Sequence, residues 1–436
     1  MLGKIDDKHS TKGLEKAERK AVKALAKKEK KKVVAGYILI NVGILFGLKY
    51  LGMFVPANHI PGFLKIAMPL GISYYTLQSL SYVIDVFRGK FKCEKDLLKL
   101  ALFVGFLPQL HEGPFGRYDQ YIGDLCNNEP LKKENVFNGI GTILWGLFKI
   151  FMVANRAAMV ADNVFQHYKE YNGVTILLGG GFFTLQLYAE FSGYIDVARG
   201  ISEIFGIRLA ENFNMPFLSK DVAEFWRRWH ISLGEWFRDY VFYPVSTCKI
   251  FRQAPDWLVI NSALLAVWFL TGLWHGASWK YVFYGLYYFV LMVGTNLLNP
   301  LISKGLSKIN IEPENKVIII IKIMLTQVLV VIGMLIFRSS DLNQFIDMAL
   351  NMFSSGESLD LLAIMDLKEL MVLIGSMALL IGVPLMKIKG ISIRYHYNQM
   401  TSVQKYLVCF SATCFVIIFG AYGLDYIPPD PIYGGF

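Results

Sequence analysis

WLVINSALLAVWFLTGLW, residues 257–274, is a predominantly apolar run that ends directly before His275. A helix of about 20 such residues crosses the hydrocarbon core of a bilayer. Similar runs make up much of the chain, and 54% of its 436 residues are hydrophobic. The period-2 alternation typical of membrane barrels is absent. The sequence therefore predicts an all-α, polytopic integral membrane protein, with further spans at Val33–Val55, Phe63–Val86, Phe137–Val160, Val174–Phe191, Tyr281–Leu298, Val317–Phe337, Leu370–Met386 and Tyr406–Leu424.

The formal charge of +10 is concentrated at the N-terminus, where residues 1–32 hold twelve Lys or Arg and five Asp or Glu. By the positive-inside rule we expect this segment in the cytoplasm, as a solvated helix that orients the first span and touches anionic lipid. It has no aromatic residues for base stacking, which argues against nucleic-acid binding. We therefore divide the chain into a basic cytoplasmic segment, residues 1–32, and one membrane domain, residues 33–436.

Two segments contain too many polar or helix-breaking residues to be ordinary spans. Leu97–Leu110 leads through Pro108 into Gly113-Pro114, so we expect a broken or re-entrant segment there. Asn212–Val245 mixes charged residues with Trp, Tyr and Phe, a composition typical of the membrane interface. It predicts amphipathic helices that lie at the cytoplasmic boundary or dip into it.

Within this interfacial segment, helical spacing would place Trp226, Trp229 and His230 on one face, because they are related as i, i+3 and i+4. Arg227 and Arg228 would then turn away from that face, towards water or phosphate.

Two histidines, His230 and His275, lie within apolar, Trp-rich sequence. Ionisable side chains at membrane depth are costly and usually line a cavity or do chemistry, and histidine exchanges a proton near neutral pH. Gly276 follows His275 and would leave the backbone uncluttered for an approaching substrate. Taken alone, His275 is more simply explained as a helix cap and His230 as an anchor among headgroups. The pair favours an enzyme over a scaffold.

Other polar groups have simpler explanations. Asp196 and Arg199 are three residues apart, so we expect a local ion pair, with orientation of a catalytic histidine as the alternative. His111-Glu112 lies in a Pro/Gly turn and is interpreted as structural. The five cysteines form no CxxC pair and there is no HExxH motif, so neither a metal site nor a disulfide framework is expected.

Five blocks of the chain, in order, resemble the membrane-bound O-acyltransferase (MBOAT) family. The resemblance is to its bacterial branch, which holds alginate O-acetyltransferases, peptidoglycan and capsule O-acetylation proteins and the teichoic-acid D-alanyl transfer protein. It covers roughly residues 33–340, and its last two blocks are highly specific. The blocks are residues 69–78, residues 106–109 with Gly113-Pro114, residues 191–196, residues 211–217 running into 224–233, and residues 272–276.

The resemblance implies a helical bundle with re-entrant and interfacial helices around a central tunnel. His275 corresponds to the family's catalytic histidine and His230 to its second characteristic polar position. We expect acyl transfer to a hydroxyl, with His275 as general base, kept neutral by desolvation. His230 and Trp229 would position the thioester or the acceptor. The remaining candidates for substrate binding are Trp226, Arg227, Arg228, Trp274, Asn212 and Asp196.

The expected donor is a cytosolic acyl thioester, acetyl-CoA first, whose phosphates could meet Arg227, Arg228 and Lys220. A D-alanyl thioester on a carrier protein is the alternative. The expected acceptor is an extracytoplasmic polysaccharide or a secreted partner acetyltransferase. No metal and no bound cofactor is required. We expect a multi-pass protein of the bacterial cell membrane with its N-terminus in the cytoplasm.

Two other classes of function remain open. A proton-coupled transporter could use histidines as a relay, but the inverted repeats of many transporters are not visible in the sequence. A scaffold that only recruits a cell-wall enzyme would leave both histidines dispensable.

Overall fold

The computed structural model describes residues 1–9, 15–55, 59, 69, 71–110, 112–127, 130–308, 310–312 and 314–422. His111, residues 56–58 and the start of the expected span at 63–68 lie outside the described residues. The described chain is almost entirely helical, with two isolated β-bridges. Its contacts divide it into two compact units, Met1–Glu129 and Pro130–Gly435, which are described one at a time.

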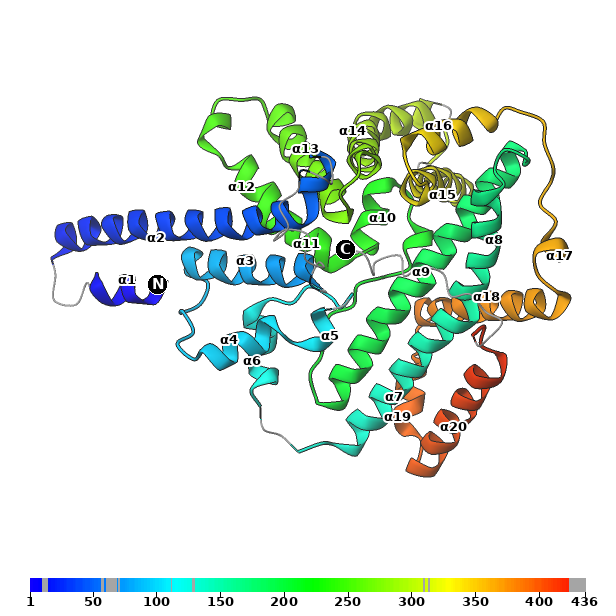
Figure 1. The fold of residues 1–436 in the computed structure, drawn as a ribbon, viewed down its shortest axis with the longest axis horizontal. Helices are drawn as coiled ribbons and strands as arrows, with labels where there is room; N and C mark the ends of the chain where they lie inside the picture. The colour runs from blue at the N-terminus through cyan, green and yellow to red at the C-terminus, as the bar shows by residue number, and fades with distance from the viewer. Residues whose placement is uncertain are drawn as a thin grey trace. The chain divides into compact units, whose positions relative to one another are not determined.

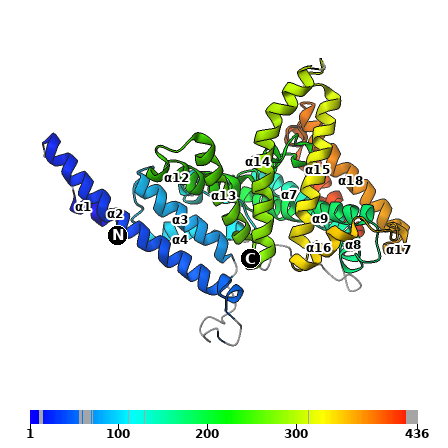
Figure 2. The same cartoon turned by 90° about the horizontal axis from the view of Figure 1, so that it is seen from above.

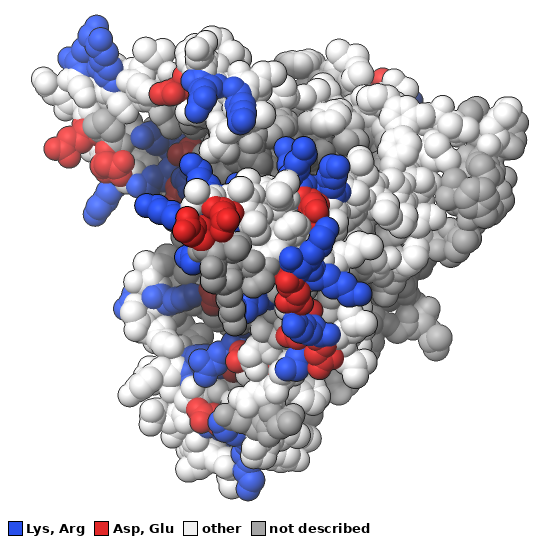
Figure 3. Space-filling view, turned by 90° about the vertical axis from the view of Figure 1, so that its left-hand side faces the viewer, with Lys and Arg blue, Asp and Glu red and all other residues white. Residues whose placement is uncertain are grey.

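The first unit is built on α2 and its contact with α3. From Lys16 onwards the basic segment and the first span form one continuous helical run, Lys16–Met53. Helix α1 folds back on the polar part of this run through Lys30–Asp6 (2.6 Å) and Lys8–Glu29 (3.3 Å) ion pairs. Figure 3, which looks onto the left-hand side of Figure 1, shows Lys and Arg side chains interspersed with Asp and Glu on that face. The helices are α1 (Leu2–Lys8), α2 (Lys16–Leu45), α3 (Ile72–Arg88), α4 (Leu97–Val104), α5 (Leu107–Leu110) and α6 (Tyr118–Leu125).

The expected break after Leu97 is present, because the helical run is divided into α4 and α5. The interruption falls at Gly105-Phe106, slightly before Pro108. Two hydrogen bonds hold the following chain: Gln78 Nε2 donates to Gln109 Oε1 (3.1 Å), and Gln109 Nε2 donates to the Pro114 carbonyl (3.3 Å). The buried side chain of Gln109 is thus paired on both sides, with Gln78 of α3 and with the backbone of Pro114.

The second unit holds most of the long apolar helices. Across the described residues of both units, eight helices are long and apolar enough to cross a membrane. In the second unit the expected runs fall within such helices, except that the last, Tyr406–Leu424, extends past the helix that ends at Phe419. The helices are α7 (Lys133–Phe148), α8 (Asn155–Gln166), α9 (Gly173–Ile204), α10 (Val222–Arg228), α11 (Ile231–Phe237), α12 (Tyr243–Ser246), α13 (Asp256–His275), α14 (Trp279–Lys308), α15 (Lys316–Arg338), α16 (Leu342–Asn351), α17 (Leu361–Ile364), α18 (Leu367–Ile388), α19 (Ile393–Gln399) and α20 (Ser402–Phe419).

Helices α7 and α9 lie side by side (Figure 1) because glycines let their backbones meet. A Cβ built at Gly139 or Gly200 would lie 2.5 Å from the other residue's carbonyl oxygen. Gly146 and Gly193 form a second pair, with corresponding distances of 2.6 and 2.9 Å. This contact fixes α9, the helix on which much of the candidate site rests.

Helices α13 and α14 form a tight hairpin, and α14 continues beside α15 (Figure 2). A Cβ at Gly272 would lie 2.3 Å from the Tyr281 carbonyl oxygen, and one at Gly285 would lie 2.2 Å from that of Trp268. The close approach places the turn of the hairpin immediately after His275. The position of His275 is therefore determined by both helices.

Candidate active site

A short antiparallel pairing of extended backbone builds the centre of the site. Phe213 pairs with Trp229 as an isolated β-bridge. Next to this bridge, the Asn214 N–H donates to the Arg228 carbonyl at 2.9 Å. The segment before α10 is thereby joined to the residues after it.

This pairing corrects one prediction. The helix α10 ends at Arg228, and Trp229 is extended, at φ −111° and ψ 129°. Trp226, Trp229 and His230 therefore do not share one helical face. The spacing rule failed because backbone hydrogen bonds to residues 212–214 replaced the next helical turn.

His230 has a left-handed backbone conformation, at φ 48° and ψ 51°. This conformation costs a non-glycine residue about 1–2 kcal/mol, so surrounding contacts must hold it. The Ile231 N–H donates to the Asn212 carbonyl (3.0 Å), and the Gly234 N–H donates to the His230 carbonyl (3.1 Å), which begins α11. His230 is thus fixed at the junction of α10 and α11.

The imidazole of His230 is 3% exposed and contacts Asn212. Asn212 Nδ2 lies 3.2 Å from His230 Nδ1, while Asn212 Oδ1 accepts from both the N–H and the hydroxyl of Ser232, each at 2.9 Å. Burial lowers the pKa of His230, which lies outside the eight long apolar helices, to about 3. Its imidazole is therefore neutral near pH 7.

Trp274 connects the two histidines. Its ring centroid lies 5.7 Å from that of His230 and 5.0 Å from that of His275, tilted by 65° and 72°. Phe191 of α9 stands edge-on to His230 at 4.8 Å. The structure thus gathers His230, Asn212, Trp274 and His275 into one buried cluster.

His275 is the last residue of α13 and is 2% exposed. Tyr284 and Phe337 stand edge-on to its ring, at 5.7 and 5.2 Å. The expectation of open space at Gly276 is wrong, because a Cβ there would lie 2.4 Å from the Tyr281 ring. The absence of a side chain at Gly276 makes room for the Tyr281 ring, which helps to enclose the imidazole of His275.

The other tryptophans support the cluster from two sides. Trp229 stacks on Phe225 (5.4 Å, 21°) and stands edge-on to Phe213 (5.1 Å, 87°). Trp226 packs against Trp268 of α13 and Tyr288 of α14, at 5.0 and 4.8 Å. Trp229 therefore packs beside the segment that precedes His230. Trp226 attaches α10 to the α13–α14 hairpin.

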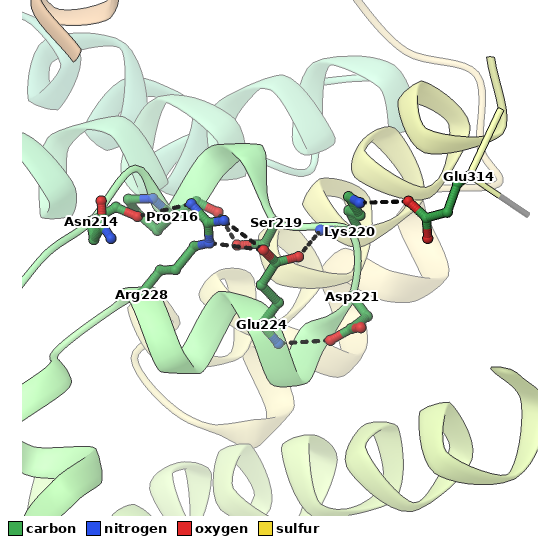
Figure 4. Close-up of polar contacts among 8 residues, drawn as sticks. All are labelled: Asn214, Pro216, Ser219, Lys220, Asp221, Glu224, Arg228 and Glu314. Atoms are coloured by element: carbon green, nitrogen blue, oxygen red, sulfur yellow. Dashed lines mark hydrogen bonds and ion pairs between the residues drawn. The ribbon is translucent and has the colours of Figure 1, made fainter. Parts of the chain in front are cut away.

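A polar network lies on α10 and the segment before it (Figure 4). Arg228 donates to Glu224 Oε1 through Nη2 (2.6 Å) and Nε (3.0 Å), and Lys220 pairs with Glu314 (2.9 Å). Burial acts to raise the pKa of Glu224, but the Lys220 N–H and Arg228 hold it below its usual value. Arg227 is exposed and forms no ion pair within the described residues, so it is the more available of the two arginines.

Asp196 lies in a partly buried ion-pair group on α9. It forms the expected pair with Arg199 (3.2 Å), but also a shorter one with Lys149 (2.7 Å). Lys149 donates to the carbonyl and the hydroxyl of Ser192 as well, at 2.7 and 2.9 Å. Sequence reasoning missed Lys149, although a lysine inside an apolar run is itself a signal. Lys149 lies between α7 and α8, which form one helical run, Lys133–Gln166, and the group joins this run to α9.

No group of three or more His, Cys, Asp or Glu residues that could hold a metal ion occurs within the described ranges. The central tunnel stays a prediction. The contacts instead define an enclosed pair of histidines. The neutral imidazole of His230 is oriented by a hydrogen bond to Asn212, and His275 lies beside the turn between α13 and α14. Such a pair can bind a carbonyl group and take a proton from a hydroxyl.

Several known proteins resemble the chain over more than half of its length. It is 35% identical over 296 residues to a protein of Pseudomonas aeruginosa named probable alginate O-acetylase, covering 67% of this chain and 52% of the relative. It is 29% identical over 281 residues to the peptidoglycan O-acetyltransferase of Helicobacter pylori, covering 57% and 52%. It is 32% identical over 280 residues to the teichoic acid D-alanyltransferase of Bacillus subtilis, covering 62% and 68%.

The chain spans about half the length of the alginate-type relatives that it matches. The sequence model of the membrane-bound O-acyltransferase family matches residues 95–336, more than half of the chain, and includes both histidines. With its long apolar helices, the chain is a multi-pass membrane protein. It belongs to the membrane-bound O-acyltransferase family.

Proposed function

We propose that this protein moves an acyl group, acetyl in the first instance, from a cytosolic thioester to a hydroxyl of an extracytoplasmic cell-surface polymer or of a secreted partner transferase. The observation that carries the proposal is the buried pair of histidines joined by Trp274, in a chain of this family. A scaffold would not need two enclosed imidazoles in contact with one indole.

In the proposed reaction His275 takes the proton of the acceptor hydroxyl as its oxygen attacks the thioester carbonyl. The new C–O bond forms and the C–S bond breaks. His275 gives the proton to the leaving thiolate, which departs as a thiol. His230 and Trp229 hold the acyl thioester in place. A correctly placed base contributes about 10²–10⁴-fold to such a step. No metal takes part in this scheme.

Two ends of α15 support access from opposite sides of the membrane. Lys220 pairs with Glu314, just before α15 begins, whereas Lys280 Nζ donates to the carbonyl of Ser339, just after α15 ends (2.5 Å). The 23 residues of α15 span about 34 Å, close to the thickness of a bilayer. The arginine-bearing segment and the turn after His275 therefore lie near opposite ends of one spanning helix.

The donor would enter beside Arg227 and Lys220, and the acceptor would approach through the α13–α14 turn, where Ala277 is exposed. Acetyl-CoA fits the first side because its phosphates would meet basic residues. A D-alanyl thioester on a carrier protein is the second candidate, because the Bacillus subtilis relative is named a teichoic acid D-alanyltransferase. Alginate, peptidoglycan and teichoic acid are the acceptor polymers that the relatives' names suggest.

Purified protein in liposomes tests the proposal. Acetyl-CoA that carries a label in its acetyl group is added outside the liposomes. Alginate, peptidoglycan fragments or lipoteichoic acid are enclosed inside them. Label should appear on one polymer with the wild type and not with His275→Ala. If polymer is labelled from a D-alanyl carrier protein and not from acetyl-CoA, the carrier-protein thioester is the donor. Absence of transfer from either donor to any polymer, with correctly folded protein, would contradict the function.

A further inference from the structure

The orientation of the Asn212 side chain follows from its contact with Ser232. The Ser232 backbone N–H can only donate, so the Asn212 atom 2.9 Å from it must be the amide oxygen. The Ser232 hydroxyl contacts the same oxygen at 2.9 Å. Two donors therefore occupy both lone pairs of Asn212 Oδ1, and its NH₂ group is the side that faces His230.

The tautomer of His230 follows in turn. Asn212 Nδ2 lies 3.2 Å from His230 Nδ1, closer than Oδ1 at 3.4 Å. Because an amide NH₂ can only donate, Nδ1 must accept, and the ring proton of the neutral imidazole must then be on Nε2. A tautomer fixed by the partner of the other ring nitrogen is a common device for orienting functional histidines.

We propose that Asn212 is a positioning residue that holds His230 as its Nε2–H tautomer, so that His230 donates a hydrogen bond to the acyl carbonyl oxygen and does not act as a base. The proposal rests on the acyl transfer proposed above. It replaces the expectation that Asn212 binds substrate, because both ends of its amide are already engaged within the protein.

The two histidines then have different tasks. His275 takes the hydroxyl proton, whereas the Nε2–H of His230 stabilises the negative charge that develops on the carbonyl oxygen. A donor placed in this way contributes about 10²–10³-fold to the rate. The left-handed backbone at His230 and the buried hydrogen bond to Asn212 are what such a donor requires, since it must be in place before charge develops.

The variant Asn212→Asp tests the tautomer by nearly isosteric replacement. A carboxylate only accepts, so the proton of His230 would move to Nδ1 and Nε2 would lose its hydrogen. We expect kcat to fall about 100-fold above neutral pH. The deficit should shrink as the pH falls, because the new carboxylate beside Nδ1 raises the pKa of His230, and protonation of the ring then restores the Nε2–H. A uniform loss at every pH would indicate a structural role and overturn the proposal.

Other ionisable groups lie on the elements around His230, and they stay in place in every variant. They are Glu190 of α9, Glu211 beside Asn212, Glu235 of α11 and His275 of α13. The difference between the pH profiles of the variant and the wild type therefore reports His230 together with the carboxylate introduced beside it.

His230→Gln is the matched variant, because a glutamine amide offers an N–H near the Nε2 position but cannot act as a base. We expect kcat within about tenfold of wild type, against a loss of at least 100-fold in His230→Ala. Adding Asn212→Asp to His230→Gln should cost little more. If the Gln and Ala variants are equally inactive and their melting temperatures are unchanged, the proposal that His230 acts as a hydrogen-bond donor is wrong.

Nitrogen-15 NMR of histidine-labelled wild-type protein tests the tautomer without any assay of activity. The signals lost in His230→Gln should be one unprotonated nitrogen, Nδ1, and one protonated nitrogen, Nε2. The reverse assignment would overturn the proposal. Because this result does not depend on turnover, a protein that shows the expected tautomer but no acyl transfer would contradict the proposed function alone.

Discussion

At the scale of single residues, the proposed chemistry depends most on His275, whose ring is enclosed by Trp274, Tyr284 and Phe337. We expect His275→Ala to lower the rate of acyl transfer by at least 10²-fold, because the base that takes the hydroxyl proton is removed. Radiolabel transfer in liposomes measures it. His396→Ala, which changes an exposed histidine of α19, is the control and should be as active as wild type. Near-normal transfer by His275→Ala would contradict the assignment.

The neighbouring arginines are expected to differ in their effects. Arg227→Ala should raise the KM for acetyl-CoA about tenfold with little change in melting temperature, since a charge-assisted phosphate contact is worth about 1.5–3 kcal/mol. Arg228→Ala should instead lower the melting temperature, because it leaves Glu224 without its ion-pair partner. Kinetics at varied donor concentration, with thermal unfolding in detergent, separate the two. A KM unchanged in Arg227→Ala would mean that Arg227 only anchors α10 at headgroups.

The candidate residues could be named from the sequence, but their arrangement could not. The motifs around His230 and His275 indicated both positions, whereas the contact of His230 with Asn212 depends on a backbone pairing across α10. Local spacing carries no information on that pairing. The role of Gly276 was misjudged for a similar reason, because Tyr281 returns from the next helix to fill the space beside it.

At the scale of elements, apolar runs predicted the long helices well, because burial in lipid imposes about 20 apolar residues on each span. The short helices between α9 and α13 were predicted only as a region. Their ends are set by contacts with distant residues, as where α10 stops at Arg228.

The glycine contact between α7 and α9 gives a prediction for the packing of these elements. Gly200→Leu should lower stability by at least about 1–3 kcal/mol, because its side chain would collide with the backbone of Gly139. Thermal unfolding in detergent measures the change. Gly181→Leu is the matched control on the same helix, since nothing lies within 4 Å of a Cβ there. Equal melting temperatures for the two variants would show that α7 and α9 do not pack this closely.

At the scale of the whole molecule, the distribution of basic residues predicts which ends of the helices face the cytoplasm. Residues 205–255, between α9 and α13, include Arg208, Lys249 and Arg252 besides the arginines of α10, whereas residues 339–366, between α15 and α18, contain no Lys or Arg. Basic loops are retained in the cytoplasm. The donor side proposed above therefore coincides with the basic side of the second unit.

Cysteine labelling tests this topology in intact cells. In a variant lacking the five native cysteines, Lys20→Cys of the basic segment should be protected from an impermeant maleimide, and Lys169→Cys, in the exposed α8–α9 loop, should react. The expectation follows from the surplus of Lys and Arg in residues 1–32 and from the basic residues at the opposite end of α9. Lys20→Cys should become reactive once the membrane is permeabilised, which shows that the residue is accessible. Labelling of Lys20→Cys but not Lys169→Cys in intact cells would show the opposite orientation in the membrane. The proposed donor side would then face outside, where no acetyl-CoA is made.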